Sequence, residues 1–495
     1  MLSSWLINFD NMKELIIARE KEKAALQRLL DKPTAQFLAV YGRRRIGKTF
    51  LLREFFGDFA FMHTALSPME LKENNNQLLY QTQLNEFAAS LQKYGSHSTQ
   101  PINNWFEAFH QLEKLLDAKR TKKKMVVFID ELPWLDTPRV GFLSAFEHFW
   151  NSWGAAKHNL LLIVCGSATT WMLDNLINSK GGLYGRITSE MHIRPFTLYE
   201  TEQYFNYRGL TMDRYDITQT YMITGGVAYY LSYFQKGKSL AQNVDDLFFS
   251  ESGFLQTEYD RLFTSLFDDN DSYRKIIESL AKNRYGITRE TIASETEIAS
   301  GGTLSQMLKA LVKSDLISVY YNFGESKRNL YYKLTDMFCL FYLGFVSKNP
   351  TNNPYFWYDN QNSPKLNSWK DRAFEDLCFV HQNQIKTSLG IIGIQSEIYP
   401  WQAKADEKTQ GAQIDLIIDR ADRVVNLCEM KFTQTDFCID KEYDAKLRNK
   451  IVVLGEKTKN KRNIQPTIVT TFGLKMNMYS NRIQRVVVLD DLFRE

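Results

Sequence analysis

The stretch of sequence that decides the fold is Gly42-Arg43-Arg44-Arg45-Ile46-Gly47-Lys48-Thr49. An apolar run at residues 37–41 precedes it, and a run with helical spacing at residues 50–56 follows it. This order predicts a strand, a glycine-containing loop and a helix, with the backbone N–H groups of the loop converging at the helix N-terminus. A basic surface loop that matched the motif by chance would lack this strand and helix context.

The residue types in the loop suit a bound polyphosphate. Gly42 and Gly47 permit the tight turn and a close approach of the backbone to the ligand. We expect Lys48 to reach the β- and γ-phosphates and the Thr49 hydroxyl to hold Mg²⁺. The remaining positions of the predicted nucleotide cradle are Arg43, Arg44, Arg45 and Ile46.

A second apolar run, residues 125–129, ends in two acidic residues, Asp130 and Glu131. It predicts a buried parallel strand, and ligands of open α/β sheets bind at the carboxyl ends of such strands. We expect Asp130 to complete the Mg²⁺ shell through water, and Glu131 to polarise the water that attacks the γ-phosphate. The alternative is that either acid only caps the turn that follows.

A third apolar run, residues 160–165, is followed by Gly166 and Ser167. It fits a strand that lies between the two nucleotide-binding strands. Two interpretations of Ser167 remain open: it contacts the γ-phosphate or the attacking water, or it caps the helix that begins near Thr169.

Four more short motifs accompany the loop: Ala18-Arg19-Glu20, Ile129-Asp130-Glu131-Leu132, Leu183-Tyr184-Gly185-Arg186 and Gly225-Gly226-Val227. In combination they resemble the AAA+-related prokaryotic ATPases called the archaeal ATPase family, in the same broad grouping as the signal-transduction (STAND) NTPases. The resemblance covers about the first half of the chain and implies ATP and Mg²⁺ as cofactors. Family members usually carry proline where Ala228 stands here.

The resemblance also implies a role for Arg186, as a γ-phosphate sensor or as a finger that reaches a neighbouring subunit. From the residues alone, an arginine after a glycine turn is most often a solvated charge. An oligomer is therefore a candidate assembly, and a monomer fits equally well.

The composition describes an ordinary globular protein. With 44% hydrophobic and 24% charged residues the chain can build several cores, and a net charge of +4 neither requires nor excludes a nucleic-acid partner. Five scattered cysteines without a C-x-x-C pair indicate reduced thiols. No apolar run approaches the length needed to span a membrane, and no secretory leader is evident, so we expect a cytoplasmic protein without a membrane partner.

The middle of the chain contains two helical patterns. The aromatic-rich segment at residues 198–262 predicts a helical lid, with its aromatics in the core. Residues 273–336 predict three short helices and a hairpin, which resembles a winged helix-turn-helix with residues 303–313 as recognition helix. Lys327 and Arg328 would lie on the wing. DNA is thus a candidate partner, and a winged helix used only for protein contacts is the alternative.

The C-terminal part carries acidic residues and a lysine at suggestive spacing. Residues 370–384 predict a helix that bears Glu375, and residues 411–419 and 424–432 predict two strands, with later strands at 450–454 and 485–491. Asp415 on the first strand, and Glu429 with Lys431 on the second, have the spacing of the PD-(D/E)XK nuclease core. Glu429 and Lys431 share one face of their strand. Asp415, Glu429 and Glu375 are candidate Mg²⁺ ligands, and Lys431 could orient or deprotonate a water.

The resemblance adds that many ATPases of this family carry a C-terminal domain of unknown function with a winged helix and a nuclease-like core. The predicted fold class is therefore α/β, with a P-loop core (residues 1–197), a helical lid (198–268), a winged helix (269–340), a linker (341–366) and a restriction-endonuclease-like domain (367–495). The expected activity is ATP hydrolysis coupled to a domain that acts on DNA. The alternative is an ATP-dependent switch or transcription-type regulator whose nuclease-like domain is a non-cutting scaffold that binds DNA or a protein partner.

Overall fold

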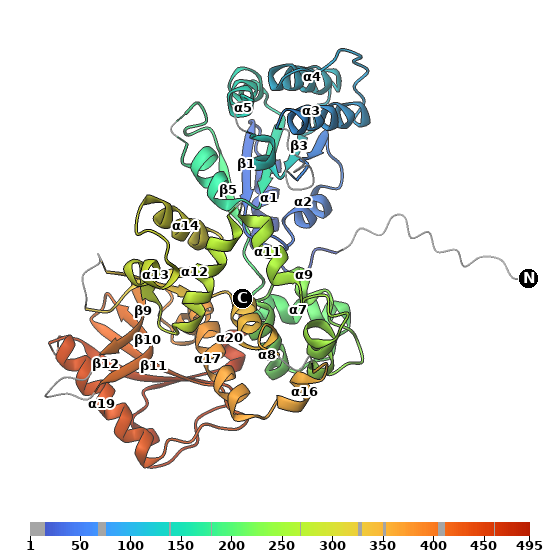
Figure 1. The fold of residues 1–495 in the computed structure, drawn as a ribbon. Coiled ribbons are helices and arrows are strands. Elements are labelled where there is room, and N and C mark those ends of the chain that lie inside the picture. Colours follow the sequence, from blue (N-terminus) through green and yellow to red (C-terminus); the bar gives the residue numbers. More distant parts are fainter. Residues whose placement is uncertain are drawn as a thin grey trace, which may run out of the picture. The chain divides into compact units, whose positions relative to one another are not determined.

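The computed structural model describes residues 15–67, 76–137, 140–179, 181–267, 269–324, 329–349, 353–403, 411–459 and 461–495. The chain divides into two compact units, Met1–Arg194 and Pro195–Glu495 (Figure 1). Among the described residues, no helix combines the length and the apolar character that a membrane crossing requires.

The first unit is built on a five-stranded parallel sheet in the order β2-β3-β4-β1-β5. The third predicted strand therefore lies between the two nucleotide-binding strands, as expected. Every residue of β3 and β4 is buried, which agrees with their uninterrupted apolar sequences. The strands are β1 (Gln36–Tyr41), β2 (Phe61–Thr64), β3 (Met125–Asp130), β4 (Leu160–Gly166) and β5 (Ser189–His192).

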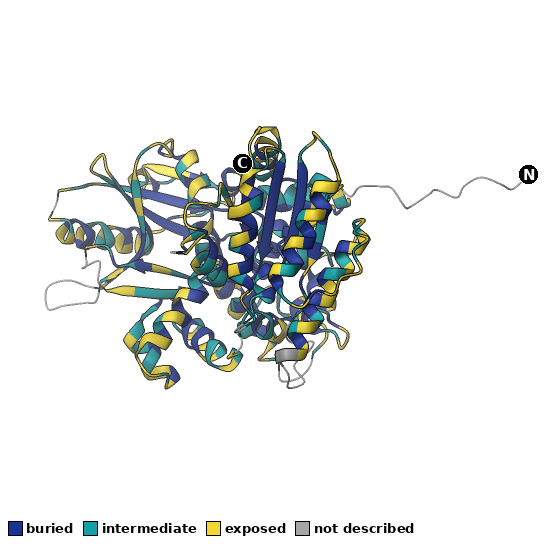
Figure 2. Cartoon of the chain, turned by 90° about the horizontal axis from the view of Figure 1, so that it is seen from above, coloured by how far each residue is buried: buried dark blue, intermediate teal, exposed yellow. Residues whose placement is uncertain are grey.

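Helices cover both faces of this sheet, as Figure 1 shows. Alternate strand residues pack against α1 and α2 on one face, and against α3, α4 and α5 on the other. Figure 2 shows the same division, with buried strands between helices whose outer faces are exposed. The bounds are α1 (Glu20–Asp31), α2 (Lys48–Phe56), α3 (Asn76–Lys93), α4 (Trp105–Ala118), α5 (Phe142–His148) and α6 (Thr169–Trp171).

The second unit begins with a helical region whose aromatic residues are core residues, as predicted. Thr197 caps α7 through a reciprocal pair of hydrogen bonds with Glu200. The helices are α7 (Leu198–Arg208), α8 (Arg214–Thr224), α9 (Ala228–Leu231), α10 (Leu240–Val244) and α11 (Glu258–Leu266).

Three helices and a three-stranded sheet of order β6-β8-β7 follow, which is the arrangement expected for a winged helix. Thr288 caps α13 by accepting a hydrogen bond from the Thr291 N–H. Lys327 and Arg328 lie outside the described residues. The elements are α12 (Asn270–Lys282), β6 (Ile287–Thr288), α13 (Arg289–Thr296), α14 (Gly302–Lys313), β7 (Ile317–Tyr321) and β8 (Leu330–Leu334).

The C-terminal part is a mixed sheet of order β13-β12-β11-β10-β9, antiparallel from β9 to β11 and parallel from β11 to β13. Residues of α17 pack on one face, and residues of α19 on the other. Its elements are α17 (Pro364–Val380), α18 (Gln382–Ser388), β9 (Ser396–Ala403), β10 (Ala412–Arg420), β11 (Val424–Lys431), α19 (Lys441–Lys457), β12 (Asn463–Thr470), β13 (Arg485–Val488) and α20 (Leu489–Leu492).

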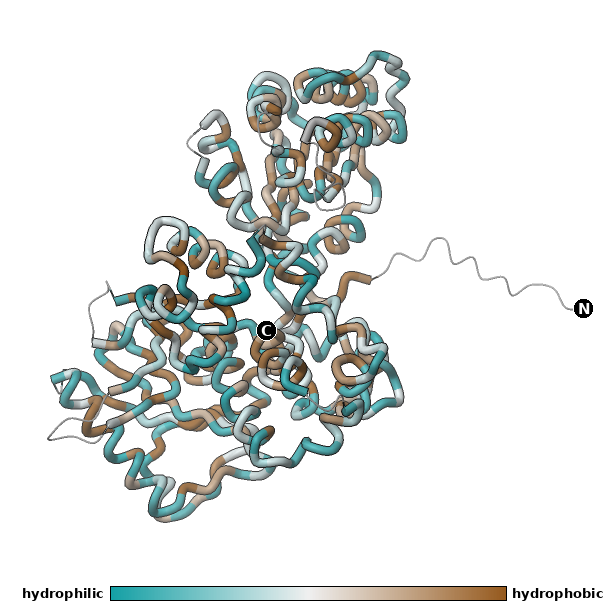
Figure 3. The backbone as a smooth tube through the Cα atoms, viewed as in Figure 1, coloured by the Kyte–Doolittle hydropathy of each residue, from teal (hydrophilic) through white to brown (hydrophobic). Residues whose placement is uncertain are grey.

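One local prediction for this part was wrong. Residues 450–454 are not a strand but lie inside α19, where Val453 and Leu454 are buried and Val452 is exposed. The segment predicted as a linker, residues 341–366, contains the helix α16 (Phe356–Asn360), with Trp357 buried. The hydropathy trace in Figure 3 shows how apolar residues recur through these segments.

Candidate functional site

The predicted phosphate loop connects β1 to α2 and has the backbone that only glycine tolerates at its first position. Gly42 has φ of 144°, and a Cβ there would lie 2.2 Å from the carbonyl oxygen of Ile193. Gly47, with φ of 90°, ends the loop immediately before α2. Arg45 also has a positive φ of 70°. The loop is thus tightly turned between the end of one strand and the start of a helix, which is the geometry of an anion cradle.

Lys48 and Thr49 begin α2, where Lys48 contacts the loop and Thr49 contacts the end of β3. The Lys48 ammonium is buried and donates to the carbonyl oxygens of Gly42 (2.8 Å) and Arg43 (2.9 Å). The Thr49 hydroxyl donates to Oδ2 of Asp130 at 2.9 Å. A threonine hydroxyl and the carboxylate at the end of β3 are oxygen ligands of the kind that Mg²⁺ prefers. In the structure, Lys48 lies at the phosphate loop, and Thr49 is in contact with Asp130.

The two acidic residues after β3 have different environments. Burial raises the pKa of Asp130, and the nearby Glu131 carboxylate raises it further. Glu131 lies in the left-handed region, with φ of 51°, and its N–H donates to Asp130 Oδ1. Glu131 is the N-cap residue of the short helix Leu132–Leu135, but its side chain makes no cap hydrogen bond there. A non-glycine residue held in this conformation is typical of functional positions.

Ser167 at the end of β4 holds Glu131. Its backbone N–H and its hydroxyl both donate to Oε2 of Glu131, each at 2.9 Å. Ser167 does not cap the following helix, since Ala168 is the N-cap of α6. Of the two interpretations from the sequence, the cap is wrong. The hydroxyl instead orients the candidate catalytic carboxylate.

The other loop residues are fixed by packing. Ile46 is buried in the core formed with α1 and α2, and Arg43 is also buried. The Arg44 guanidinium lies over the Trp134 ring, 5.8 Å from its centroid. Arg19, which the sequence indicated only through the family resemblance, donates to the carbonyl oxygens of Ile46 (3.4 Å) and Arg194 (2.7 Å). Arg19 thus supports the loop from behind.

Arg186 comes before the amino end of β5, whereas the phosphate loop follows the carboxyl end of β1, so the two lie toward opposite ends of these parallel strands. β5 runs parallel to β1 with Ser189 opposite Leu38 and His192 opposite Tyr41, so the level of Gly42 is one residue beyond His192. About four residues of strand, or roughly 13 Å, separate Ser189 from that level, and Arg186 comes three residues before Ser189. Arg186 is exposed. The register thus separates Arg186 from the phosphate loop along the strand direction.

A second group of predicted residues lines a cleft of about 280 Å³ in the C-terminal part. Asp415 of β10 and Glu429 and Lys431 of β11 all contribute to it, as the sequence predicted. Asp415 Oδ2 accepts from the Met430 N–H at 3.0 Å, and the Lys431 ammonium lies 4.0 Å from the same oxygen. Both carboxylates are buried, whereas Lys431 is partly exposed.

Two residues of α19 bind the Glu429 carboxylate. Lys450 donates to both of its oxygens, at 2.7 and 2.6 Å, and the Tyr443 hydroxyl donates to Oε2 at 3.1 Å. Burial raises the pKa of Glu429, and Asp415 raises it further, while Lys450 opposes this shift. Neither partner of Glu429 was predicted, because residues 450–454 were expected to form a strand and not to continue a helix from Tyr443. On a helix, Tyr443 and Lys450 are seven residues apart and share one face.

Glu375 comes from α17 and forms an ion pair with Arg284, from the turn between α12 and β6. Burial raises the pKa of Glu375 to about 7, Asp415 adds to the shift, and Arg284 opposes it. Within the described residues, no group of three or more His, Cys, Asp or Glu side chains is arranged to hold a metal ion. Glu375, Asp415 and Glu429 thus line one cleft, but as separately paired carboxylates and not as an assembled ligand set.

A family model matches within the N-terminal half of the chain, whereas a relative covers more of it. Residues 16–234 match the family model described as an ATPase domain predominantly from Archaea. An uncharacterized protein of Methanocaldococcus jannaschii is 25% identical over 347 residues, which cover 68% of this chain and 70% of that protein. The family match ends at residue 234, so it assigns no family to residues 235–495.

Solved structures are similar at low identity. A Walker-type ATPase of Pyrococcus abyssi has a TM-score of 0.43 and 20% identity, and the match covers 66% of this chain and 96% of that one. The ORC2 protein of Aeropyrum pernix, solved with ADPNP and ADP, has a TM-score of 0.39 and 15% identity over 71% of this chain and 96% of its own. The phosphate loop and the strand order β2-β3-β4-β1-β5 lie within the residues that match this family model.

Proposed function

We propose that the phosphate loop binds ATP with Mg²⁺ and hydrolyses it. The observation that carries this proposal is the hydrogen bond of 2.9 Å between Thr49 Oγ1 and Asp130 Oδ2. This pair joins the first turn of α2 to the end of β3 and supplies two oxygen ligands of the type that Mg²⁺ selects. The ion, when bound, would offset the charge on the β- and γ-phosphates.

The residues of the chain supply the remaining steps. Lys48, which now donates to two loop carbonyl oxygens, turns its ammonium toward the phosphates when they enter the cradle. Glu131 orients a water molecule for in-line attack on the γ-phosphorus, and Ser167 holds Glu131 by one oxygen. The other oxygen of Glu131 remains to accept the water proton.

The position of Arg186 supports an assembly of copies. Arg186 is exposed and comes before the amino end of β5, away from its own phosphate loop. Its guanidinium is therefore suited to reach the nucleotide of a neighbouring copy. We propose an oligomer in which Arg186 acts in this way. Hydrolysis that rises more steeply than protein concentration, and loses this rise in Arg186→Ala, is the expected result.

The test of ATP hydrolysis is phosphate release by the purified full-length chain. We expect Lys48→Ala to abolish ATP binding at the phosphate loop, and Glu131→Gln to retain ATP binding while hydrolysis falls by a factor on the order of 100 or more. Lys21→Ala, an exposed position on α1, is the matched control and should behave as wild type. Wild-type hydrolysis by Glu131→Gln would refute the assignment of the base.

A second candidate function is action on nucleic acid at the C-terminal cleft. Asp415, Glu429 and Lys431 line one cleft together with Lys446 and Lys450, so a phosphodiester would meet both carboxylates and ammonium groups there. The alternative, a non-cutting scaffold that binds DNA or a protein partner, is favoured by the Lys450–Glu429 pair, because that pair occupies a carboxylate which cleavage would need for a metal.

Strand scission separates these two alternatives. Purified chain with Mg²⁺, ATP and mixed nucleic acids should cut if Asp415 and Lys431 are catalytic, and cutting should vanish in Asp415→Ala and in Lys431→Ala. Lys441→Ala, on the first turn of α19 and outside the cleft, is the matched control. Binding without scission in the wild type would support the scaffold.

A further inference from the structure

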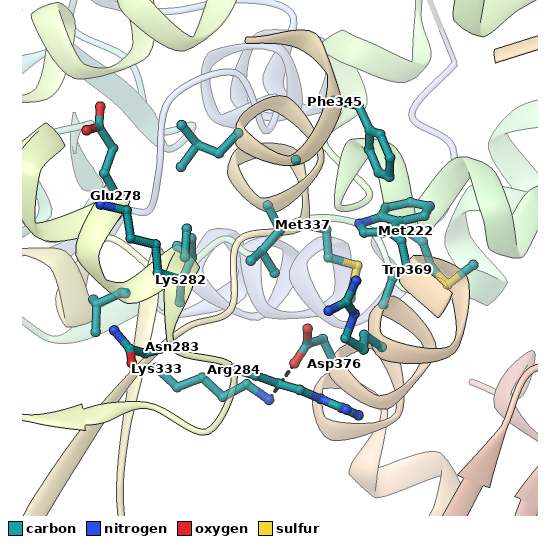
Figure 4. Close-up of a pocket in the computed structure, with 18 of the residues that line it drawn as sticks. Met222, Glu278, Lys282, Asn283, Arg284, Lys333, Met337, Phe345, Trp369 and Asp376 are labelled. Atoms are coloured by element: carbon teal, nitrogen blue, oxygen red, sulfur yellow. Dashed lines mark ion pairs between the residues drawn. The ribbon is translucent and has the colours of Figure 1, made fainter. Parts of the chain in front are cut away.

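A cavity of the second unit lies apart from the phosphate loop and beside the C-terminal cleft, with which it shares the lining residue Arg284. It has a volume of about 570 Å³, within the range typical of small-ligand sites. Its walls come from α8, from the end of α12 with β8, from the segment α15 (Met337–Phe341) with the turn η7 (Tyr342–Val346), and from α17. Figure 4 shows side chains of these segments pointing into one shared space.

The floor of this cavity is apolar and aromatic. Met222, Met337, Phe345 and Trp369 are all buried and line it. The Trp369 ring packs edge-on against Phe345, with 5.4 Å between ring centroids. Thioether and indole groups of this kind pack well against a flat ring.

The remaining lining is strongly basic. Six lysine and arginine residues line the cavity against two acids, and Figure 4 marks the ion pair of 2.5 Å between Lys333 and Asp376 inside it. In the part of the chain that the structure describes, Lys282, Lys348 and Arg372 form no ion pair. The basic residues are Lys282, Arg284, Lys333, Lys348, Lys365 and Arg372, and the acids are Glu278 and Asp376.

We propose that this cavity binds a small organic phosphate of the nucleotide class, such as a nucleoside monophosphate. The ring of the ligand packs on Trp369 and Met337, and its phosphate is held by the basic rim, with Arg372 among its partners. A monovalent carboxylate would need fewer cations than this cavity provides, whereas a phosphate dianion matches them. The site is separate from the phosphate loop, which belongs to the first unit.

Gly344 provides a direct way to close this cavity. It lines the cavity from η7, and a Cβ built on it meets no atom within 4 Å. Gly344→Leu therefore fills the space without removing an existing contact, and it replaces a residue of poor helix propensity. Arg372→Glu reverses a charge at the exposed rim. Lys441→Glu, exposed on α19 and outside the cavity, changes the net charge by the same amount and is the matched control.

The experiment measures the fluorescence anisotropy of N-methylanthraniloyl-AMP with the full-length chain. We expect saturable binding that Lys48→Ala and Lys441→Glu leave unchanged, that Gly344→Leu abolishes, and that Arg372→Glu weakens about tenfold or more, because a charge-assisted contact becomes repulsive. Unlabelled AMP should displace the probe. Persistence of binding in Gly344→Leu, its loss in Lys48→Ala, or displacement by myristate or a short single-stranded oligonucleotide but not by AMP would overturn the proposal.

Discussion

Replacing Ser167 by alanine is expected to slow ATP hydrolysis without weakening ATP binding. Ser167 is almost fully buried, and its hydroxyl and its backbone N–H donate to the same oxygen of Glu131, each at 2.9 Å. The alanine variant loses the hydroxyl and keeps the backbone donor. Glu131 therefore stays near its place but is held by one hydrogen bond instead of two.

The size of the effect follows from the charge on the acceptor. A hydrogen bond to a charged group contributes about 1.5–3 kcal/mol, and we take the lower part of this range because the second donor remains. A loss of about 1.5–2 kcal/mol in the orientation of the attacking water corresponds to a fall in kcat of roughly 10- to 30-fold. KM should stay close to that of wild type, since the lost contact goes to Glu131 and not to the nucleotide.

Steady-state phosphate release and equilibrium ATP binding provide the two readouts. Ser167→Thr keeps the hydroxyl and should restore most of the rate, which a general packing defect would not allow. Double substitution with Glu131→Gln should cost little beyond Glu131→Gln alone, because both changes act on the same water. Unchanged kcat in Ser167→Ala, or a raised KM with normal kcat, would show that the hydroxyl does not act through Glu131.

Three further predictions concern stability. Gly42→Ala should lower the free energy of unfolding of the first unit by about 2 kcal/mol or more, because its Cβ would meet Ile193, whereas Gly95→Ala, which has positive φ but no atom within 4 Å, should cost less in the same thermal scan. Ala228→Pro should raise the melting temperature of the second unit through a gain of about 0.4–1 kcal/mol, since Ala228 is the first residue of α9, where proline fits; a lower melting temperature would contradict this. Burial lowers the pKa of His381 from 6.5 to about 4, so the unfolded chain takes up the proton first and stability falls as the pH drops from about 6.5 toward 4. Between pH 8 and pH 5.5, the free energy of unfolding in urea should therefore fall by about 1.4 kcal/mol more in the wild type than in His381→Gln. Equal falls in the two proteins would refute this prediction.

Part of the candidate phosphate site could be anticipated because two of its residues come at the ends of long apolar runs. Asp130 follows one such run and Ser167 another, and the parallel order of β3, β4 and β1 brings their ends to one edge. What the sequence left open was the contact between Ser167 and Glu131. That contact depends on the left-handed conformation of Glu131, which no residue pattern indicates.

The C-terminal cleft was only half predictable, for a different physical reason. The run at residues 450–454 is rich in β-branched residues and, taken alone, fits a strand as well as a helix. The start of the helix decides the matter, because Asp440 caps α19 by accepting from the Tyr443 N–H ten residues before that run. Lys450 consequently points at Glu429 from a helix, and the carboxylate predicted as a metal ligand is already paired.

The helical region and the C-terminal part pack within one compact unit, and this decides how movement passes between them. His381 Nε2 at the end of α17 accepts from the Leu198 N–H that begins α7, at 3.0 Å. Asp245 accepts from the backbone N–H groups of Trp357 and Tyr358, at 2.7 and 3.1 Å. A helical region that hinged alone would break these buried hydrogen bonds and open a continuous apolar core. Any displacement of α7 during the nucleotide cycle is therefore expected to carry α17 with it, and with α17 the carboxylate that faces the C-terminal cleft.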